Sequence, residues 1–341
     1  MTAGRPIGRR AFLIAGAGAA GLIACRGAGK SSPPAPRRTP SLAEWLGHPA
    51  DARLLILHAD DAGIARSANA ATIEAFDRGV IDSASVMVPC PAFAAFAGWA
   101  RTREQAPDVG VHLTFTSQPS ERWGPVSGAA AVPSLVDADG MFPAPLPATR
   151  TVSIPELERE TRAQIALARA SGLTLTHLDG HQHILQLRSA ESFDVLVRVS
   201  RDERLPFRFA RAWTSSRAPY AEGRLAGVTQ PLERLISISP SSTTPERWAE
   251  WYEGQVRDLP AGLSELFVHL GHPDAELRAV VPDSANWGAE WRGRDLAMLS
   301  SPVFTAALAE RGVTRIGWSA VRDYQRWLSR SPATRGAASP G

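Results

Sequence analysis

The chain has little cysteine, almost no lysine and no long apolar run. It contains 2 cysteines in 341 residues, and Lys30 is its only lysine. Cys25 and Cys90 lie too far apart to form a CxxC metal knuckle, and two cysteines provide no disulfide framework, so we expect any metal to be held by histidine and carboxylate. The formal net charge of +3, with no basic run in the body of the chain, argues against nucleic-acid binding.

The N-terminal residues are typical of an export signal. Arg9 and Arg10 precede an apolar run from Ala11 to Ala24, which is shorter than the roughly 20 residues that a membrane-spanning helix needs. The paired arginines resemble a twin-arginine export signal, and the segment 22–25 (LIAC) resembles the lipobox of bacterial lipoproteins, in which Cys25 becomes the lipidated first residue. The alternative is an export signal that is cleaved elsewhere and discards Cys25.

These patterns predict four segments along the chain. Residues 1–25 are expected to form the export signal with its lipobox, and residues 26–45, which are rich in proline, to form a tether. Residues 46–330 are expected to form a single domain, and residues 331–341 a flexible tail. The protein is therefore expected to be exported and lipid-anchored to the bacterial cell envelope, on its periplasmic or extracytoplasmic face, in contact with the membrane only through its lipid anchor.

Short apolar runs alternate with helical patterns in the body of the chain, which is typical of βαβ units. Strands are expected at 54–57, 84–88, 109–115, 173–179, 207–209, 265–270 and 314–318, and helices at 67–76, 92–101 and 155–170. Residues 119–150, with many glycines and prolines, predict a long loop or lid. Because no GxGxxG follows a strand, we expect an α/β fold of the (β/α) barrel type, whether a complete TIM-type barrel or an incomplete or distorted one, rather than a doubly wound sheet.

Ligand-type side chains lie at the ends of three predicted strands, where (β/α) barrels carry their reactive groups. They are the pair Asp60 and Asp61, the single His112, and the alternating residues His177, Asp179, His181 and His183. Taken singly, an Asp-Asp pair before Ala-Gly is more often a turn or a helix cap, and a lone strand histidine is more often a core residue. The four alternating residues are expected to share one strand face, although a solvated edge strand would show the same pattern.

Together these residues predict a metal site. Asp61, His112 and one histidine of the third strand form a two-histidine, one-carboxylate set, which binds one divalent ion and leaves coordination positions open. Asp60 points elsewhere and is free to act as a base. An open metal site beside an unligated carboxylate suits hydrolysis, because the ion activates water and the carboxylate accepts its proton.

In this order the motifs resemble those of the YdjC-type carbohydrate deacetylases, which are related to the polysaccharide deacetylases. The matching stretches are 55–63, 82–87, 109–113, 133–142, 176–183 and, more loosely, 265–269. The resemblance implies a (β/α) barrel-like fold and the metal-dependent removal of an acetyl group from an N-acetylated sugar. Alternatives are metal-dependent hydrolysis of another amide or ester, and a non-catalytic sugar-binding lipoprotein.

The resemblance also implies roles for single residues. Metal ligands are Asp61, His112 and His181, which would hold one divalent ion, either Zn, Mg, Mn, Co or Ni. Asp60 would be the catalytic base, and Arg208 would hold the base or the substrate, unless it is an ordinary surface arginine.

This chain departs from the family pattern at two places. Ala62 stands where the family usually has an aromatic residue. The family's Glu-x-x-x-His-Pro reads here as Glu265-x-x-x-His269, with a second histidine, His272, directly before proline. We favour His269 as the general acid over His272, with His183 as the next candidate.

Overall fold

The computed structural model describes residues 38–144, 146–147, 149–239, 242–284 and 286–331. The expected export signal, Cys25, most of the tether and nearly all of the expected tail lie outside the described residues. Helix α1 (Leu42–Trp45) begins at a Ser41 capping box and buries Leu42 in a core cluster with residues of helix α12 (Trp318–Arg330). The predicted tether is therefore too long at its C-terminal end, because packing of these apolar residues extends the folded domain to before residue 46. Within the described ranges, no helix has the length and apolar character to cross a membrane.

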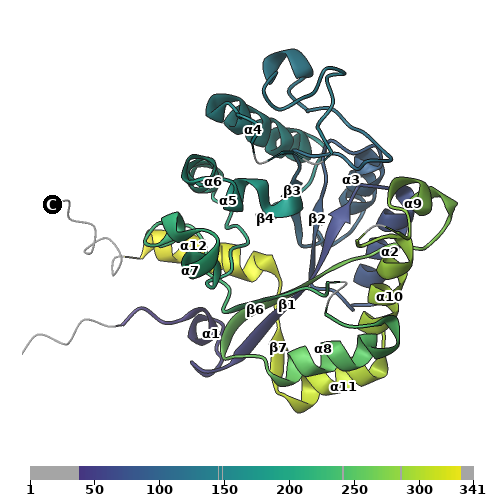
Figure 1. Cartoon of the computed structure of the whole chain (residues 1–341). Coiled ribbons are helices and arrows are strands. Elements are labelled where there is room, and N and C mark those ends of the chain that lie inside the picture. The colour runs from purple at the N-terminus through teal and green to yellow at the C-terminus, as the bar shows by residue number, and fades with distance from the viewer. Residues whose placement is uncertain (1–37, 145, 148, 240–241, 285, 332–341) are drawn as a thin grey trace, which may run out of the picture. The chain divides into compact units, whose positions relative to one another are not determined.

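The core of the domain is a sheet in which every strand pair is parallel. Its strands are β1 (Arg53–Ala62), β2 (Ser83–Val86), β3 (Val109–Leu113), β4 (Leu175–Gly180), β5 (Arg234–Ile236), β6 (Gly262–His269) and β7 (Val313–Arg315). The order is β4-β3-β2-β1-β6-β5, and β7 pairs with the first residues of β1. Sheets of this kind are normally covered by helices, as this one is (Figure 1).

Two isolated bridges close the sheet into a ring. The segment 206–211 pairs with β4 through the Leu178–Phe207 bridge. On its other side it pairs with the segment that leads into β5, through the Ala210–Leu232 bridge. Since β5 pairs with β6, the ring is continuous, and the prediction of a distorted (β/α) barrel is confirmed. The strand predicted at 207–209 is reduced to these bridges, and three-residue β5 was not predicted.

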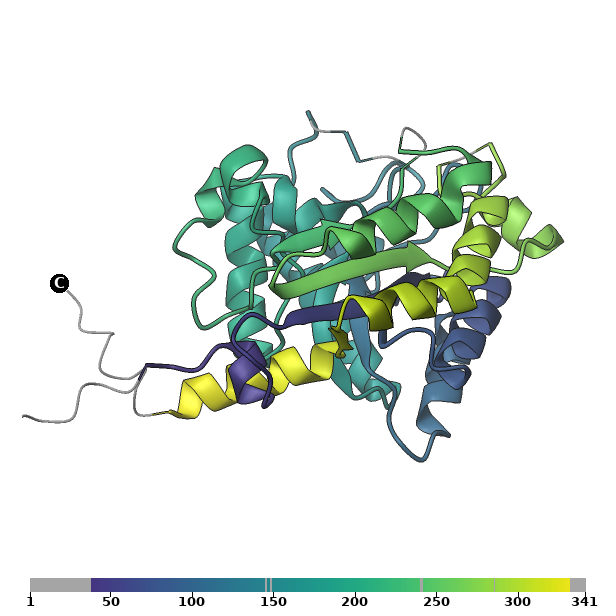
Figure 2. The same cartoon turned by 90° about the horizontal axis from the view of Figure 1, so that it is seen from below.

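The helices pack around the outside of the sheet (Figures 1 and 2). The longer ones are α2 (Arg66–Asp77), α3 (Phe93–Arg101), α4 (Ile154–Ala170), α6 (Ala190–Glu203), α8 (Trp248–Arg257), α10 (Ala289–Leu299), α11 (Pro302–Glu310) and α12. Short helices are α5 (Ile184–Leu187), α7 (Trp213–Ser216) and α9 (Ala275–Val280). The predictions for α2, α3 and α4 are confirmed. The strand predicted at 314–318 is wrong at its end, because Trp318 begins α12 and its indole is buried.

Alternation along β1 separates two environments. Leu55, Leu57 and Ala59 belong to the apolar cluster between sheet and helices. Leu54 belongs to a different cluster that includes the indole of Trp318. Because side chains alternate along a strand, the same inward direction is continued by a histidine and an aspartate in the second half of β1. The barrel interior is thus apolar at the N-terminal end of the strands and polar at their C-terminal end.

The prediction of a long loop at 119–150 is confirmed for its described residues, which contain only one 3-10 turn, at 129–131. The carboxylate of Glu160 on α4 fastens this loop, since it accepts hydrogen bonds from the backbone N–H groups of Val126 and Ser127 at 3.0 and 2.9 Å. The loop borders the C-terminal end of the barrel, where Gln118 and Pro119 line a cavity.

Candidate metal and catalytic site

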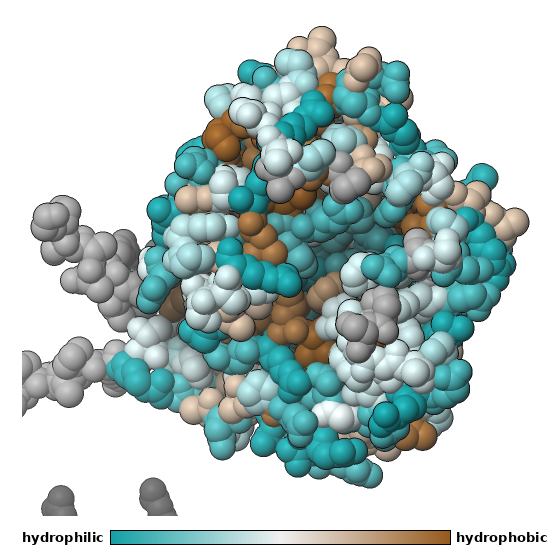
Figure 3. Space-filling view, viewed as in Figure 1, coloured by the Kyte–Doolittle hydropathy of each residue, from teal (hydrophilic) through white to brown (hydrophobic). Residues whose placement is uncertain are grey.

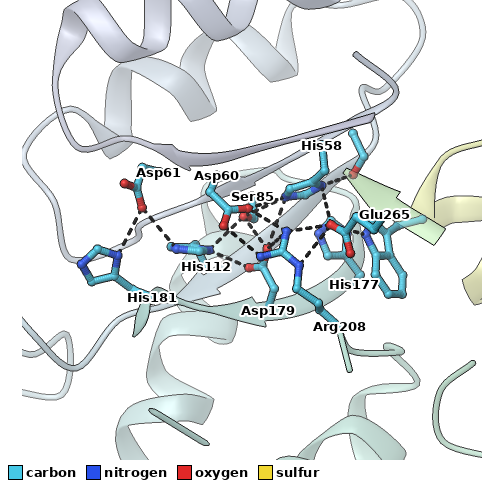
Figure 4. A network of polar contacts seen from close by, with 12 residues as sticks. His58, Asp60, Asp61, Ser85, His112, His177, Asp179, His181, Arg208 and Glu265 are labelled. Atoms are coloured by element: carbon cyan, nitrogen blue, oxygen red, sulfur yellow. Dashed lines mark hydrogen bonds and ion pairs between the residues drawn. The ribbon is translucent and has the colours of Figure 1, made fainter. Parts of the chain in front are cut away.

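Buried charges fill the polar half of the barrel, and we call five of them the inner network: His58, Asp60, Asp179, Arg208 and Glu265 (Figure 4). Arg208 donates two hydrogen bonds to Asp60, at 2.7 and 2.8 Å. The same guanidinium lies 2.7 Å from Glu265 and 3.0 Å from Asp179. Arg208 is fully buried, so it is not a surface arginine, and it binds the predicted base.

His58 is the second cation of the inner network. Its Nε2 atom lies 3.1 Å from Asp60 Oδ1 and 3.3 Å from Asp179 Oδ2. Burial opposes the charged imidazole, but hydrogen bonds to Asp179 and Asp60 outweigh it and raise the pKa of His58 to about 9. At neutral pH the carboxylates of the inner network therefore face two cations, Arg208 and His58.

His177 lies beside the inner network but stays neutral. Its ring stacks on the Trp318 indole and meets the His58 ring edge-on, and the ring centroids are 5.0 Å apart in both pairs. Burial and the neighbouring His58 cation hold the pKa of His177 well below its ordinary value. The ring also fills the space over Gly110, where an added Cβ would lie 2.5 Å from it, so β3 requires glycine at this position.

The backbone of β1 turns Asp60 and Asp61 into different parts of the site. The ladder with β2 shifts its register between Ala59 and Ala62, and Asp61 has φ +64°, a left-handed conformation that is uncommon outside glycine. The turn is held by a hydrogen bond from Met87 N to Ala62 O at 2.7 Å. Strained backbone of this kind is often retained at functional sites.

Three residues next to this turn form the outer triad: Asp61, His112 and His181 (Figure 4). His112 Nε2 and His181 Nδ1 each lie 3.2 Å from the same oxygen, Asp61 Oδ1. Arg292 donates to the other oxygen, Asp61 Oδ2, at 2.7 Å. Burial opposes ionisation, but Arg292 and the two imidazoles hold the pKa of Asp61 well below its ordinary value.

Asp179 links the two groups of residues. Its Oδ1 atom lies 2.8 Å from His112 Nδ1, and its Oδ2 atom accepts a hydrogen bond from Ser85 at 2.7 Å. Burial opposes a charged His112, but the Asp179 and Asp60 carboxylates raise its pKa to about 10. A carboxylate on Nδ1 orients the ring so that Nε2 faces Asp61, which is the usual support for a metal-binding histidine.

The outer triad has the composition and spacing of a metal site. One ligand atom of each residue lies within 4.8 Å of the others, all three side chains are buried, and His181 Nε2 has no hydrogen-bond partner among the described residues. Two imidazoles and one carboxylate suit a divalent transition metal and leave positions open. The group could therefore hold a metal ion.

A second set of donors, His58, His177 and Asp179, has similar spacing but a different environment. Arg208 already lies 3.0 Å from Asp179, and both ring nitrogens of His58 lie within 3.1 Å of serine hydroxyls. A guanidinium at this distance would repel a metal ion, so the inner set is a hydrogen-bonded charge network.

The expectation that His177, Asp179, His181 and His183 share one strand face is wrong. β4 ends at Gly180, and Gln182 and His183 have φ of +56° and +55°. Only His177 and Asp179 keep the strand alternation. The left-handed turn leaves His181 at Asp61 but places His183 against Trp213, with ring centroids 4.9 Å apart, where burial lowers the pKa of His183 to about 3.

The two candidate acids occupy different places. His269 ends β6 in the cavity, and its Nε2 atom lies 3.8 Å from Asp61 Oδ2. Burial lowers the pKa of His269 to about 4. His272 is 44% exposed, lies 3.3 Å from Glu74 on α2, and does not line the cavity.

A cavity of about 640 Å³ lies at the C-terminal ends of the strands. Its lining includes Asp60, the outer triad, His269, Arg292 and Trp287. The space-filling view shows a hollow in this face in which hydrophilic and apolar side chains meet (Figure 3). Trp287 is a tryptophan that lines this cavity, and an indole of this kind can stack on a sugar ring.

Three charged residues of the site were not assigned roles from the sequence. His58 shares the inward alternation of β1 with Asp60, and this pattern could have found it. Glu265 was noted only as a motif residue. Arg292 lies on α10, 231 positions after Asp61 in the sequence, and no local pattern predicts that contact.

Comparisons with known proteins place the chain in a family. Residues 54–310 match the family model described as "YdjC-like protein". A carbohydrate deacetylase of Geobacillus stearothermophilus is 30% identical over 77% of this chain and 96% of its own length. Another, from Thermus thermophilus, is 33% identical over 80% of this chain and 94% of its own length. The crystal structure of a candidate cellobiose-phosphate cleavage protein from Enterococcus faecalis has a TM-score of 0.67 and 26% identity, covering 78% of this chain and 98% of that one.

Proposed function

The chain belongs to the YdjC-like protein family, and from this premise we propose that it is a metal-dependent carbohydrate deacetylase, which hydrolyses the amide of an N-acetylated sugar. The observation that carries the proposal is the outer triad beside Asp60 at one cavity. All of the predicted ligands and the predicted base are present there, which favours a hydrolase over a protein that only binds sugar.

The outer triad would hold one divalent ion, either Zn, Mn, Co, Ni or Mg. When bound, such an ion lowers the pKa of a water molecule and polarises the acyl carbonyl. Asp179 keeps the His112 ring in place, and Arg292 keeps the Asp61 carboxylate in place, so that these ligands are oriented before the ion arrives.

Asp60 is the proposed base. It lines the cavity, while Arg208 and His58 hold its carboxylate from the interior side. Burial opposes ionisation, but Arg208 and the imidazoles keep the pKa of Asp60 well below its ordinary value, so the carboxylate is unprotonated at neutral pH, which is the state that a general base requires. The fixed position of Asp60 reduces the entropy lost when the transition state forms.

His269 is the proposed acid for the leaving amine. Collapse of the tetrahedral intermediate breaks the C–N bond and requires a proton on nitrogen. Because burial lowers the pKa of His269 to about 4, its imidazole is neutral at neutral pH in the substrate-free protein, and the proton that it passes to the amine is the one that the attacking water releases. The nearby Asp61 and Asp60 carboxylates favour that protonation.

Acetate release from a panel of N-acetylated oligosaccharides tests the proposal. We expect release by the purified protein, its loss after treatment with a chelator, and its recovery when one of the five divalent ions is added back. A protein that releases acetate equally well with and without chelator would contradict metal dependence. Cleavage of other amides or esters, with no release from any sugar, would replace the proposed substrate.

We also propose that the protein is exported and anchored by lipid at Cys25. The support is the order of paired arginines, apolar run and lipobox in residues 9–25. Mass spectrometry of the mature N-terminus should find lipidated Cys25, and Cys25→Ser should remove it. A soluble wild-type protein that starts well after residue 25 would contradict this proposal.

A further inference from the structure

Several buried polar atoms at the cavity have no partner among the described protein atoms. They are His181 Nε2, His183 Nδ1, His269 Nδ1, Trp287 Nε1 and Arg292 Nη1. Buried polar groups are almost always hydrogen-bonded, so such atoms indicate where a ligand completes the site. His181 and His269 already have proposed roles, and the ring of His183 packs against Trp213. The two remaining donors, Trp287 Nε1 and Arg292 Nη1, belong to one wall of the cavity, which we call the α10 wall.

Arg292 is held rigidly in this wall. Its side chain is 2% exposed, Nη2 donates to Asp61 Oδ2 at 2.7 Å, and Nε donates to the backbone oxygen of Trp287 at 2.9 Å. These two bonds fix the plane of the guanidinium, while Nη1 has no hydrogen-bond partner among the described residues. Because arginine cannot lose its proton in a protein, the hydrogens on Nη1 require an acceptor.

Trp287 is placed by the same contact. It has φ +56°, an uncommon conformation for a bulky residue, and Arg292 binds its carbonyl oxygen. The centroid of the indole lies 5.5 Å from that of the His269 ring, so this wall adjoins the proposed acid. An indole N–H is only a donor, so both unpartnered groups of the wall offer hydrogens and neither offers an acceptor.

A wall with two donors and one positive charge selects an oxygen ligand that carries negative charge. We propose that the α10 wall is the acyl subsite, in which Arg292 Nη1 and Trp287 Nε1 donate to the acyl oxygen during hydrolysis and to the carboxylate of the acetate product. This inference rests on the proposed deacetylase function. Water adds its oxygen to the acyl carbon, the C–N bond breaks, the amine takes a proton, and acetate remains with its charge shared between two oxygens.

Acetate itself is the probe, because it is the expected product and binds without turnover. In the zinc-loaded full chain, we expect Trp287→Phe to weaken acetate binding about 3- to 10-fold, as for the loss of one neutral hydrogen bond, and Arg292→Gln to weaken it about 10- to 100-fold, as for a charged one. Arg294→Gln, on the same helix but exposed, is the matched control and should bind acetate like wild type. Calorimetry gives the dissociation constants, and elemental analysis gives the zinc content of each variant.

The two variants separate a binding role from a structural one. Trp287→Phe keeps the backbone oxygen and every bond of Arg292, so its effect cannot pass through Asp61. If only Arg292→Gln weakens acetate, or if neither does, the acyl subsite is excluded. If acetate binding depends on both residues but no N-acetylated sugar is hydrolysed, the subsite stands and the proposed sugar substrate fails.

Discussion

The inner network and the outer triad are adjacent but complete to different degrees. In the inner network the three carboxylates, those of Asp60, Asp179 and Glu265, share two cations that the protein supplies, Arg208 and His58. In the outer triad two imidazoles converge on a single oxygen of Asp61, His181 Nε2 has no partner among the described residues, and the backbone is strained. In the inner network, Glu265 Oε2 also has no hydrogen-bond partner among the described residues, but the protein itself supplies the cations that balance the carboxylates. The difference indicates that folding balances the charges of the inner network, whereas a ligand completes the outer triad.

The largest expected effect comes from removing a ligand of the outer triad. His181→Ala should abolish bound divalent metal and, with it, acetate release, because two ligands are too few for a stable site. Elemental analysis of the purified protein measures the metal. His181 sits at the end of β4, so the inner network should survive, and an unchanged circular dichroism spectrum would show this. Full metal occupancy in the variant would contradict the assignment of the outer triad as the metal site.

Removing the base should have a different result from removing a ligand. We expect Asp60→Asn to keep its metal, because Asp60 belongs to the inner network, and to lose about 10² to 10⁴ in rate, the usual contribution of a general base. Asp61→Asn is the matched variant at the next position, and it should lose the metal. Metal loss in Asp60→Asn together with retention in Asp61→Asn would reverse the two roles.

The next largest effect should distinguish the two candidate acids, His269 and His272, by their contribution to the rate. His269→Ala should keep the metal and lose about 10² or more in rate, because His269 lies in the cavity and its proposed role is proton transfer. His272→Ala should change the rate by less than about twofold, since its ring is exposed and pairs with Glu74 outside the cavity. Steady-state kinetics on one N-acetylated substrate measures both. The opposite ranking would move the acid to His272.

The smallest effect concerns His58 and pH. The pKa of His58 is about 9 in the folded chain against 6.5 ordinarily, so its proton stabilises the fold fully below pH 6.5, and this stabilisation is lost as pH rises through 9. Denaturant titrations of the metal-loaded protein should show a fall in unfolding free energy on the order of a few kcal/mol between these pH values. His58→Gln should lack this part of the fall, while His272→Gln, at an exposed histidine, should follow wild type. Parallel curves for wild type and His58→Gln would mean that His58 is neutral in the fold.

Most of the barrel could be predicted from local pattern. Apolar runs and helical periodicity located β1, β3, β4 and β6 and helices α2, α3 and α4, because burial acts on residues close in sequence. Strand β5 and the bridges around Phe207 escaped prediction. They are only a few residues long, and the neighbouring strands make them part of the ring.

For the site, the sequence by itself determined which residue types are available: an Asp-Asp pair after a buried strand, His112 on another strand, and a histidine-rich strand end. Alternation was sufficient to bring these side chains to one end of the barrel. Their division into two groups was not determined locally. It depends on the left-handed backbone at Asp61, His183 and Gln182, which breaks the alternation where the strands end.

The partners of the carboxylates were decided by the tertiary structure alone. Arg208 lies 148 positions from Asp60, and Arg292 lies 231 positions from Asp61. The resemblance to a family singled out Arg208, but no local feature distinguishes Arg292 from the many arginines on the surface. Folding does so, because a guanidinium can be buried only where carboxylates lie within hydrogen-bond distance, and closure of the barrel provides those positions at the two aspartates.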